Sequence, residues 1–296
     1  MTLEKLGEDE LLRRILPRLP SNSEVIARAG DDCALTCRPP KGALLVLKTD
    51  CVVEGIHFTS KASARDVGWK AMARPLSDFA AMSATPQFAM VTLIAPARTN
   101  PEWITTLYRG LNKCAHRFGV AIVGGETSNT RGPISISVSV TGQVEKGRAV
   151  LRSGGKQGDA LWVTGKLGGS SKRRHLRFVP RIEESRWLTE RFHVHAMMDL
   201  SDGLGADLRR LASASDVGFE INEAAIPRQR GCTALDAIRD GEDYELLFAV
   251  ASDDGERLLR EWKKRWRLKL TRIGELTKRD AISGIASGYV HFKKRA

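Results

Sequence analysis

The chain has 296 residues, of which 42% are hydrophobic and 28% charged, and its formal net charge is +12. This composition is ordinary for a soluble globular protein and allows one large core or two of moderate size. No hydrophobic run reaches the roughly 20 residues that a membrane-spanning helix needs, and the charged N-terminus lacks the hydrophobic core of a signal peptide. Five cysteines without a Cys-x-x-Cys pair argue against a disulfide framework and a structural zinc site. We therefore expect a cytoplasmic protein.

The first half of the chain alternates predicted helices and strands. Hydrophobic periodicity and turn residues predict, in order, a helix over 9–19, a strand over 43–50, a helix over 64–83, a strand over 88–95, a helix that begins at Asn100-Pro101-Glu102, a strand over 120–123 and a strand over 134–140. In the last strand, serines at every second position predict one hydrophobic and one small polar face. Pro75 lacks a backbone donor and should kink or break its helix.

A boundary near Lys146 separates this half from a second unit that again mixes strands and helices. The predicted elements are a strand over 159–165, a helix over 180–192, a turn and helix over 199–212, strands over 217–221 and 244–250, a basic helix, and a strand over 268–273. The pattern predicts two α/β or α+β domains, which we place at residues 1–146 and 147–296.

Most of the positive charge is local. Residues 257–279 contain ten Lys and Arg against two Asp and Glu, and Trp262 and Trp266 stand among the basic residues. Such a mixture could stack on the bases and bind the phosphates of a nucleic acid. The alternative, which we favour, is an amphipathic helix whose basic side faces water and whose tryptophans reach the core.

Acidic residues stand beside Gly, Ser or Thr at the ends of several predicted elements. They fall in Gly30-Asp31-Asp32, Thr49-Asp50, Ser77-Asp78, Gly125-Glu126-Thr127, Asp199-Leu200-Ser201-Asp202-Gly203-Leu204 and Asp240-Gly241-Glu242-Asp243-Tyr244-Glu245. Carboxylates are costly to bury without a partner, so shared cations explain the whole set, and Mg²⁺ prefers such hard oxygen ligands. Any one of these residues could instead form a turn or cap a helix, as Asp199 or Ser201 could for the helix that follows.

Phosphate-binding loops are absent in their common forms, because the chain has neither a P-loop nor a dinucleotide-binding glycine pattern. The glycine-rich turn at 165–170 follows a predicted strand, but on its own it is weak support for phosphate binding. Arg152 could bind a phosphate oxygen through its guanidinium group, or it could be a surface arginine.

Taken in order, nine segments of the chain resemble the thiamine-monophosphate kinase family, which belongs to the superfamily of aminoimidazole-ribotide synthetase. The similar segments are GDDCA (30–34), KTDCVVEGIHF (48–58), GWKAMARPLSDFAAMSATP (68–86), VGGETS (123–128), RSGGKQGD (152–159), VTGKLG (163–168), HLRFVPR (175–181), DLSDGLGADL (199–208) and GEDYELLF (241–248). Each motif is modest alone, but their ordered set is specific and spans nearly the whole chain.

The resemblance implies that the γ-phosphoryl group of ATP is transferred directly to thiamine monophosphate, which gives thiamine diphosphate and ADP. The acceptor phosphate is already ionised at neutral pH, so we expect no catalytic general base. By similarity, Mg²⁺ would be held by Asp32, Thr49, Asp50, Asp78, Asp199 and Asp202. The nucleotide would be lined by Gly125, Glu126, Arg152 and Ser201, and thiamine monophosphate would contact His57, Glu242 and Tyr289.

The resemblance also implies a two-domain PurM-like fold. An N-terminal α/β domain with a mixed sheet would form a barrel with its copy in a homodimer, and an α+β domain would follow. The active site would lie between the two domains and near the dimer interface. We expect no membrane partner and favour a small-molecule substrate over nucleic acid.

The chain departs from the family pattern at several positions. Lys48 stands where a small hydroxyl residue is usual, Pro75 replaces Asn, Glu126 replaces Asp, and Asp240 replaces Gly. The segment 168–175 is also shorter than usual. Alternatives therefore remain: another ATP-using enzyme of the superfamily, such as an aminoimidazole-ribotide or selenophosphate synthetase, a nucleic-acid-binding protein that uses residues 257–279, or an inactive relative.

Lys48 is the departure with the clearest physical consequence. Side chains alternate faces along a strand, so Lys48 and Asp50 should point the same way. We therefore expect the Lys48 ammonium to lie within salt-bridge reach of Asp32, Asp50 or Asp78, where it would replace one metal ion with a fixed charge. The alternative is that Lys48 extends into solvent and has no chemical role.

Overall fold

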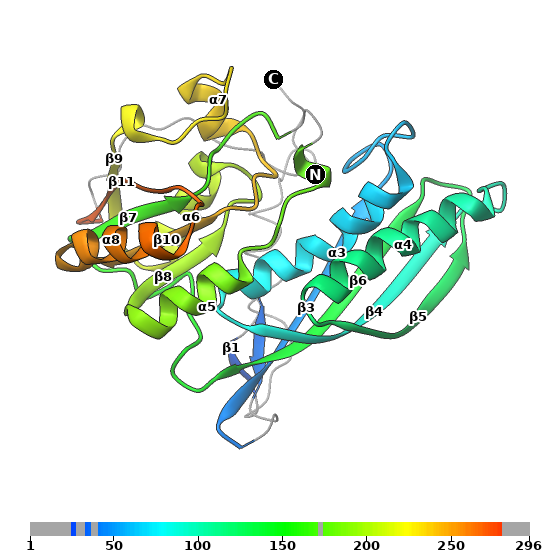
Figure 1. Cartoon of the computed structure of the whole chain (residues 1–296), viewed down its shortest axis with the longest axis horizontal. Helices are drawn as coiled ribbons and strands as arrows, with labels where there is room; N and C mark the ends of the chain where they lie inside the picture. The colour runs from blue at the N-terminus through cyan, green and yellow to red at the C-terminus, as the bar shows by residue number, and fades with distance from the viewer. Residues whose placement is uncertain (1–24, 28–32, 37–40, 171–173, 280–296) are drawn as a thin grey trace, which may run out of the picture.

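The computed structural model describes residues 25–27, 33–36, 41–170 and 174–279. The helix expected over 9–19, the expected metal ligand Asp32 and the expected substrate residue Tyr289 lie outside these ranges. Within them the chain forms two sheets, each with helices packed against it (Figure 1).

The N-terminal sheet has six strands in the order β1-β2-β3-β6-β4-β5. The strands are β1 (Val25–Ala27), β2 (Ala34–Thr36), β3 (Ala43–Val53), β4 (Thr85–Ala95), β5 (Ala121–Asn129) and β6 (Ser135–Glu145). Only the β4–β5 pair is parallel among these described strands. Helices α3 (Ala64–Ala81) and α4 (Pro101–Arg117) lie side by side over one face of the sheet (Figure 1).

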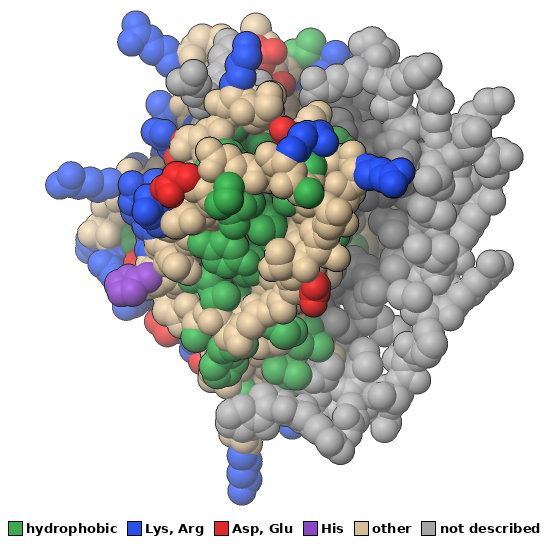
Figure 2. Space-filling model, turned by 90° about the vertical axis from the view of Figure 1, so that its right-hand side faces the viewer, with side chains coloured by type: hydrophobic (Ala, Val, Ile, Leu, Met, Phe, Trp, Pro, Cys, Tyr) green, Lys and Arg blue, Asp and Glu red, His purple; other side chains and the backbone are tan. Residues whose placement is uncertain are grey.

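Strand β6 confirms the predicted alternation of its two faces. Its hydrophobic residues Ile136, Val138 and Val140 are buried, and the serines between them are half-buried. On β4 and β5, in contrast, Phe88, Met90 and Val123 are 50%, 52% and 61% exposed. At the end of the molecule that carries β5 and α4, hydrophobic side chains gather in the middle of the visible face, with Lys and Arg around them (Figure 2).

Helix α3 continues through Pro75, so the break that the sequence allowed does not occur. Its close contact with α4 depends on glycine. A Cβ atom on Gly68 would lie 2.0 Å from the Leu107 carbonyl oxygen, and one on Gly110 would lie 2.0 Å from the Arg65 carbonyl oxygen. The two helices therefore meet backbone to backbone at these positions. Helix α4 begins as predicted, because the Asn100 side chain accepts a hydrogen bond from the Glu102 N–H.

The C-terminal sheet is fully antiparallel, in the order β8-β10-β7-β11-β9. Its strands are β7 (Asp159–Thr164), β8 (Val194–Asp199), β9 (Gly218–Ile221), β10 (Leu246–Ala251) and β11 (Leu270–Thr277). The helices of this part are α5 (Ile182–Arg191), α6 (Leu204–Ala214), α7 (Ala234–Arg239) and α8 (Gly255–Arg265), with short 3-10 turns η2 (Arg174–Leu176), η3 (Glu223–Ala225) and η4 (Ser252–Asp254). Strands β1, β2 and β8 and helix α7 were not predicted.

Helix α8 has the amphipathic character that we favoured for the basic stretch. Trp262 is buried, with 1% of its surface exposed, and its indole N–H donates to the Leu268 carbonyl. Lys263, Lys264 and Arg265 are exposed on the other side. The tryptophan therefore belongs to the core, and the basic residues face water. None of the helices in the described ranges is long and hydrophobic enough to cross a membrane.

The two sheets are joined through α3. This helix packs on β3 and β6 of its own sheet and, on its other side, on α5 and β8 of the C-terminal part. Buried residues of both parts, such as Phe79 and Phe248, belong to one hydrophobic cluster. Arg74, Ser77 and Asp78 of α3 therefore lie between β3 and the end of β8.

Candidate active site

The C-terminal half of α3 places two carboxylates beside two cations. Lys48 on β3 lies with its Nζ 3.0 Å from Oδ2 of Asp78 on α3, so it takes the first of the two positions expected from the sequence. Arg74 on α3 lies with a guanidinium nitrogen 3.2 Å from Oδ1 of Asp50 on β3, and it also donates to the Cys51 carbonyl at 2.6 Å. The strand and the helix thus each contribute one cation and one carboxylate, and the four groups form two ion pairs between β3 and α3.

Thr49 points away from this cluster. Because side chains alternate along β3, it faces the opposite side from Lys48 and Asp50. Its hydroxyl accepts a hydrogen bond from the Ser139 hydroxyl at 3.0 Å and lies 3.3 Å from the Ser137 hydroxyl, both on β6. The structure therefore does not bring the Thr49 side chain to the expected metal ligands.

The other carboxylates come from the turn between β8 and α6. The Ser77 hydroxyl of α3 donates to Oδ2 of Asp199, at 2.6 Å, which links the two domains. Asp202 forms an ion pair with Arg210, which also contacts Oδ1 of Asp207 at 2.9 Å. Burial, with the nearby Asp202 charge, raises the pKa of Asp207 well above its usual value. Arg210 of α6 therefore holds the Asp202 carboxylate, which is more than a helix cap.

A second turn, at 241–245, packs tightly on the first. The Glu242 N–H donates to the Ser201 carbonyl at 2.6 Å, and the Tyr244 N–H donates to the Leu200 carbonyl at 2.8 Å. Glu242 and Tyr244 have φ angles of +64° and +52°, a region that costs free energy for residues other than glycine.

The Glu242 carboxylate ends in a buried polar cluster around Lys70 of α3. The Lys70 side chain is fully buried, and its Nζ donates to Oε1 of Glu242 at 2.5 Å and to the His57 carbonyl at 2.7 Å. His175 Nδ1 lies 2.7 Å from the same Nζ and 2.9 Å from Oε2 of Glu242. The cluster joins both domains, since His57 and Lys70 come from the first and His175 and Glu242 from the second.

Charge in this cluster is set by burial and by the partners. Burial lowers the pKa of Lys70 to about 8, although Glu242 opposes the shift. Burial also disfavours ionised Glu242, but its bonds to His175 and Lys70 lower the pKa of Glu242 to about 2. For His57, burial and then the cations Arg74 and Lys70 lower the pKa to about 4. Its Nδ1 accepts the Val53 N–H at 3.0 Å, as a neutral ring does. Glu242 is therefore anionic and His57 neutral at physiological pH.

The glycine-rich turn at 165–170 is already occupied by side chains of the protein. The Gly168 N–H donates to Oδ2 of Asp243 at 2.9 Å, and the Gly169 N–H donates to Oδ2 of Asp240 at 2.7 Å. Ser170 bonds the other Asp243 oxygen, and burial raises the pKa of Asp243 to about 6. These amides hold the second turn and do not form a phosphate-binding loop.

Three expected nucleotide residues are more scattered. Gly125 and Glu126 lie on the exposed edge strand β5, which the strands β6 and β4 separate from β3 and its Asp50. A Cβ on Gly125 would lie 1.8 Å from the Val91 carbonyl oxygen, so only glycine fits there. Arg152 lies in the connection between β6 and β7, where its carbonyl accepts the Ser215 hydroxyl at 2.9 Å.

Comparison with known proteins agrees with the motifs. The family descriptions "AIR synthase related protein, N-terminal domain" and "AIR synthase related protein, C-terminal domain" match residues 30–144 and 151–287. The thiamine-monophosphate kinase of Rhodopirellula baltica is 37% identical over 93% of this chain and 91% of its own length, and that of Bacillus subtilis is 33% identical over 97% and 100%. A solved structure described as AaThiL complexed with AMPPCP and TMP is 30% identical, with a TM-score of 0.81 over 100% of this chain and 96% of that chain.

The chain belongs to the thiamine-monophosphate kinase family. The two-domain PurM-like fold expected from the sequence is thereby confirmed. The junction of β3, α3 and the two turns brings together the metal candidates Asp50, Asp78, Asp199 and Asp202 with the substrate candidates His57 and Glu242.

The oxygen donors at this junction have the chemistry that Mg²⁺ prefers, because they are carboxylates and Mg²⁺ is bound through one or two carboxylates plus substrate phosphates. Asp50, Asp78 and Asp202 each already pair with a cation of the protein. Among the described residues, no three His, Cys, Asp or Glu side chains form a metal site. The donor set therefore fits magnesium only if further oxygens come from a nucleotide or from outside the described ranges.

Several residues that organise the junction had no role assigned to them from the sequence. These are Lys70, Arg74, Ser77, His175, Arg181 and Arg210. Arg181 binds both carboxylate oxygens of Glu245, at 2.6 and 2.8 Å, and Thr164 donates to Glu245 at 2.8 Å. Lys70, Arg74 and Ser77 all lie in the segment 68–86, and their spacing of three and four residues on a helix was the signal that could have grouped them.

Proposed function

We propose that this chain transfers the γ-phosphoryl group of ATP to thiamine monophosphate and releases thiamine diphosphate and ADP. Curated relatives that cover nearly the full chain are thiamine-monophosphate kinases, and a structural neighbour binds AMPPCP, an ATP analogue, together with TMP. The observation that carries the proposal is the junction at α3, where an anionic Glu242 and a neutral His57 lie beside a group of carboxylates and cations.

The reaction needs positioning and charge neutralisation more than proton transfer. An oxygen of the acceptor phosphate forms a bond to the γ-phosphorus as the bond to the β,γ-bridging oxygen breaks, and ADP carries that oxygen away. The acceptor is ionised at neutral pH, so no side chain has to remove a proton. The obstacle is the repulsion between two polyanions, which fixed cations and aligned donors reduce.

The carboxylates at the junction are our candidates for magnesium ligands. They are Asp50, Asp78, Asp199 and Asp202, with Asp32 as a further candidate and Thr49 contributing at most through its backbone. Bound Mg²⁺ would neutralise phosphate charge as it develops in the transition state. Lys48 lies 3.0 Å from Asp78, so in this chain an ammonium supplies part of that positive charge directly.

The substrates would lie on opposite sides of this group. For the nucleotide we propose Gly125, Glu126, Arg152 and Ser201. For thiamine monophosphate we propose His57, Glu242 and Tyr289. The anionic Glu242 suits the positive thiazolium ring, and Lys70 holds that carboxylate in place from the buried side.

We further propose two domains, at residues 1–146 and 147–296, and a homodimer in the cytoplasm. Exposed Phe88 and Met90 on β4 and Val123 on β5 would be covered if the free face of the N-terminal sheet packed against its copy. This arrangement would also bring the exposed edge strand β5, with Gly125 and Glu126, toward an active site of the partner. The separation of these two residues from the carboxylates of their own chain supports it.

A substrate panel tests the proposed function. Purified protein with Mg-ATP should release ADP with thiamine monophosphate and not with formylglycinamidine ribotide or selenide, the substrates of the two synthetase alternatives. Consumption of ATP with one of those substrates alone, measured as release of ADP or AMP, would favour that synthetase. Tight binding of an oligonucleotide at about 100 mM salt, without any ADP release, would favour the nucleic-acid alternative.

A further inference from the structure

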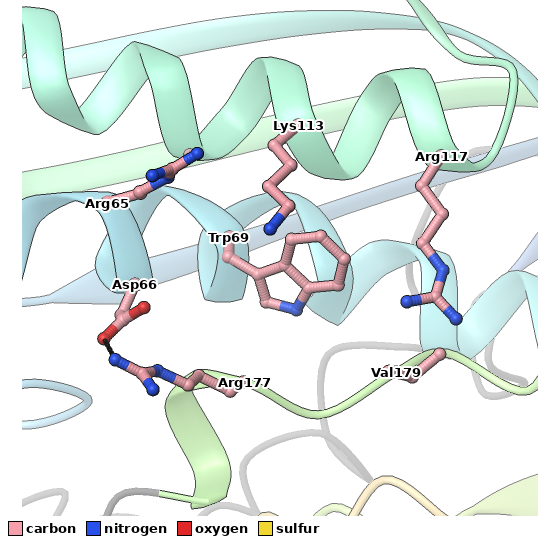
Figure 3. Close-up of a pocket in the computed structure, with 8 residues that line it drawn as sticks. Arg65, Asp66, Trp69, Lys113, Arg117, Arg177 and Val179 are labelled. Atoms are coloured by element: carbon pink, nitrogen blue, oxygen red, sulfur yellow. Dashed lines mark hydrogen bonds and ion pairs between the residues drawn. The ribbon is translucent and has the colours of Figure 1, made fainter.

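A separate pocket opens on the outer side of α3, between α3, α4 and the segment that leads into α5. Its volume is about 420 Å³, within the usual range for small-molecule sites. Figure 3 shows Arg65, Asp66 and Trp69 coming from α3, Lys113 and Arg117 from α4, and Arg177 from the connecting segment. The Lys113 side chain points toward the indole ring of Trp69.

The floor of this pocket exists because two helices touch through glycine. Gly110 lines the pocket, and its missing side chain lets α4 approach the Arg65 carbonyl of α3. Because the two backbones are this close, the longer side chains on either side of the contact, such as Trp69 and Lys113, form the sides of the pocket. The helix crossing therefore forms one side of the hollow, and the segment with Arg177 and Val179 forms the other.

The pocket carries an excess of positive charge. Of its four cations, Arg177 has a carboxylate partner, Asp66, whose Oδ2 lies 2.7 Å from the guanidinium group. Among the described residues, no acidic side chain pairs with Arg65, Lys113 or Arg117. Lys113 and Arg117 instead lie over Trp69, at 6.0 and 5.9 Å from its ring centre. Three cations without a counter-ion around one hollow favour an anionic ligand.

Trp69 provides a fixed aromatic wall. Its indole N–H donates to the Phe178 carbonyl at 2.7 Å, which locks the ring, and its side chain is only partly buried. An aromatic face beside cations binds a planar ring that carries phosphate, since the ring stacks and the phosphate pairs with the cations. The Trp69 ring would add little to the binding of an anion that has no planar ring.

We propose that this pocket binds a nucleotide, with its base on Trp69 and its phosphates between Lys113, Arg117 and Arg65. The site is distinct from the carboxylate junction. Lys70, the residue after Trp69, points to the other side of α3 and bonds Glu242 there. Because neighbouring residues of one helix contact the two places, a nucleotide on Trp69 would be in a position to influence how Lys70 holds Glu242.

The test measures ADP binding in EDTA by calorimetry at low salt. Without metal, the carboxylates of the junction lack the cation that would join them to phosphates and each offers its protein cation only in shared form, so ADP should bind weakly there, whereas the cationic pocket needs no metal. We expect one ADP per chain, binding that weakens with added salt, and pyrophosphate binding that is weaker than ADP by about tenfold because it cannot stack. The double variant Lys113→Ala/Arg117→Ala should weaken ADP binding at least about tenfold.

The matched control is Lys263→Ala/Lys264→Ala, which removes the same charge from two exposed positions of α8, a helix that does not line the pocket. It should bind ADP as the wild type does, and both variants should melt at the wild-type temperature. Absence of ADP binding in EDTA, or equal binding by the pocket variant and the wild type, would overturn the proposal. Equal affinity for pyrophosphate and ADP would overturn the role of Trp69. None of these results depends on whether the chain is a kinase.

Discussion

Three cations of the N-terminal domain reach into the group of candidate ligands, and each has a different burial. Lys70 is fully enclosed, the Arg74 side chain is 14% exposed, and the Lys48 side chain is 24% exposed. Buried ion pairs are costly to break, because the remaining charge is left without a partner. The enclosed Lys70 therefore has a positioning role toward Glu242, whereas Lys48 is open enough to exchange its partner for a phosphate or a metal ion.

Replacing Lys48 tests whether its ammonium stands in for a metal ion. In Lys48→Ser, Asp78 loses its neighbouring positive charge, so its carboxylate should attract a divalent cation more strongly. We expect more Mg²⁺ per chain in the complex with a non-hydrolysable ATP analogue, measured by elemental analysis after gel filtration. Lys41→Ser, at the exposed turn before β3, is the control and should leave the metal content unchanged. If Lys48→Ser and the wild type have the same metal content, the Lys48 ammonium does not stand in for a metal ion.

Asp202 is the second residue whose role can be separated from packing. Asp202→Asn keeps the shape and can still accept a hydrogen bond from Arg210, but it loses the charge offered to a cation. We expect turnover to fall more than about tenfold, with little change in melting temperature. Asp253→Asn on the surface is the control. Turnover above about a tenth of the wild-type value would leave Asp202 with a structural role alone.

His57 predicts a specific loss of stability in acid. Its pKa is lowered to about 4 in the folded protein, whereas the usual value is 6.5, so between these values the unfolded chain binds a proton that the folded chain does not. Stability should therefore fall as pH drops from 6.5 to about 4. The variant His57→Asn retains an acceptor for the Val53 N–H and should show a shallower fall in melting temperature over that window. His116→Asn, exposed on α4, should fall as steeply as the wild type; equal slopes in all three proteins would contradict the account.

At the scale of elements, the sequence predicts best where one strong periodic signal decides the structure. The alternation in β6 predicted a strand and the amphipathic pattern of α8 predicted a helix, and each pattern also predicted which face is buried. Strands β1 and β2 are only three residues long, too short for periodicity to indicate them. Strand β8 was missed because VHAMMD has one β-branched residue and no Phe, Tyr or Trp, whereas the equally buried β7 and β10 contain more residues that favour strands. Pro75 did not break α3, because packing on both domains holds the helix through the missing hydrogen bond.

The contact between α3 and α4 predicts a large penalty at one glycine. In Gly68→Ala the new methyl group would lie 2.0 Å from the Leu107 carbonyl oxygen, so the helices would have to separate. We expect a loss of roughly 1–3 kcal/mol or more in the free energy of unfolding, measured with urea. Gly132→Ala, whose nearest new contact is at 3.4 Å, should cost far less. Similar stability of the two variants would mean that the helix crossing is not tight.

At the scale of the molecule, the sequence predicted one ion pair of the candidate carboxylates, Lys48 with Asp78, but not their other partners. Asp199 and Asp202 stand at the end of β8 and in the turn after it, as expected, whereas Asp50 and Asp78 lie inside β3 and α3, because β3 continues to Val53 and α3 to Ala81. Their partners Arg74, Ser77 and Arg210 required three-dimensional packing, since each comes from a neighbouring helix. Thr49 was expected among the metal ligands, but its side chain lies on the opposite face of β3 from Asp50, because adjacent residues of a strand face opposite ways. Asp32 and Tyr289 stay predictions.

Direct observation of the products tests the central claim. Purified chain, Mg-ATP and thiamine monophosphate are incubated together, and thiamine diphosphate, ADP and inorganic phosphate are quantified by chromatography. Direct transfer predicts one thiamine diphosphate for each ADP and no matching rise in inorganic phosphate. Asp202→Asn serves as the matched inactive protein. Formation of ADP and inorganic phosphate in equal amounts without thiamine diphosphate, or no turnover of ATP at all, would contradict the account.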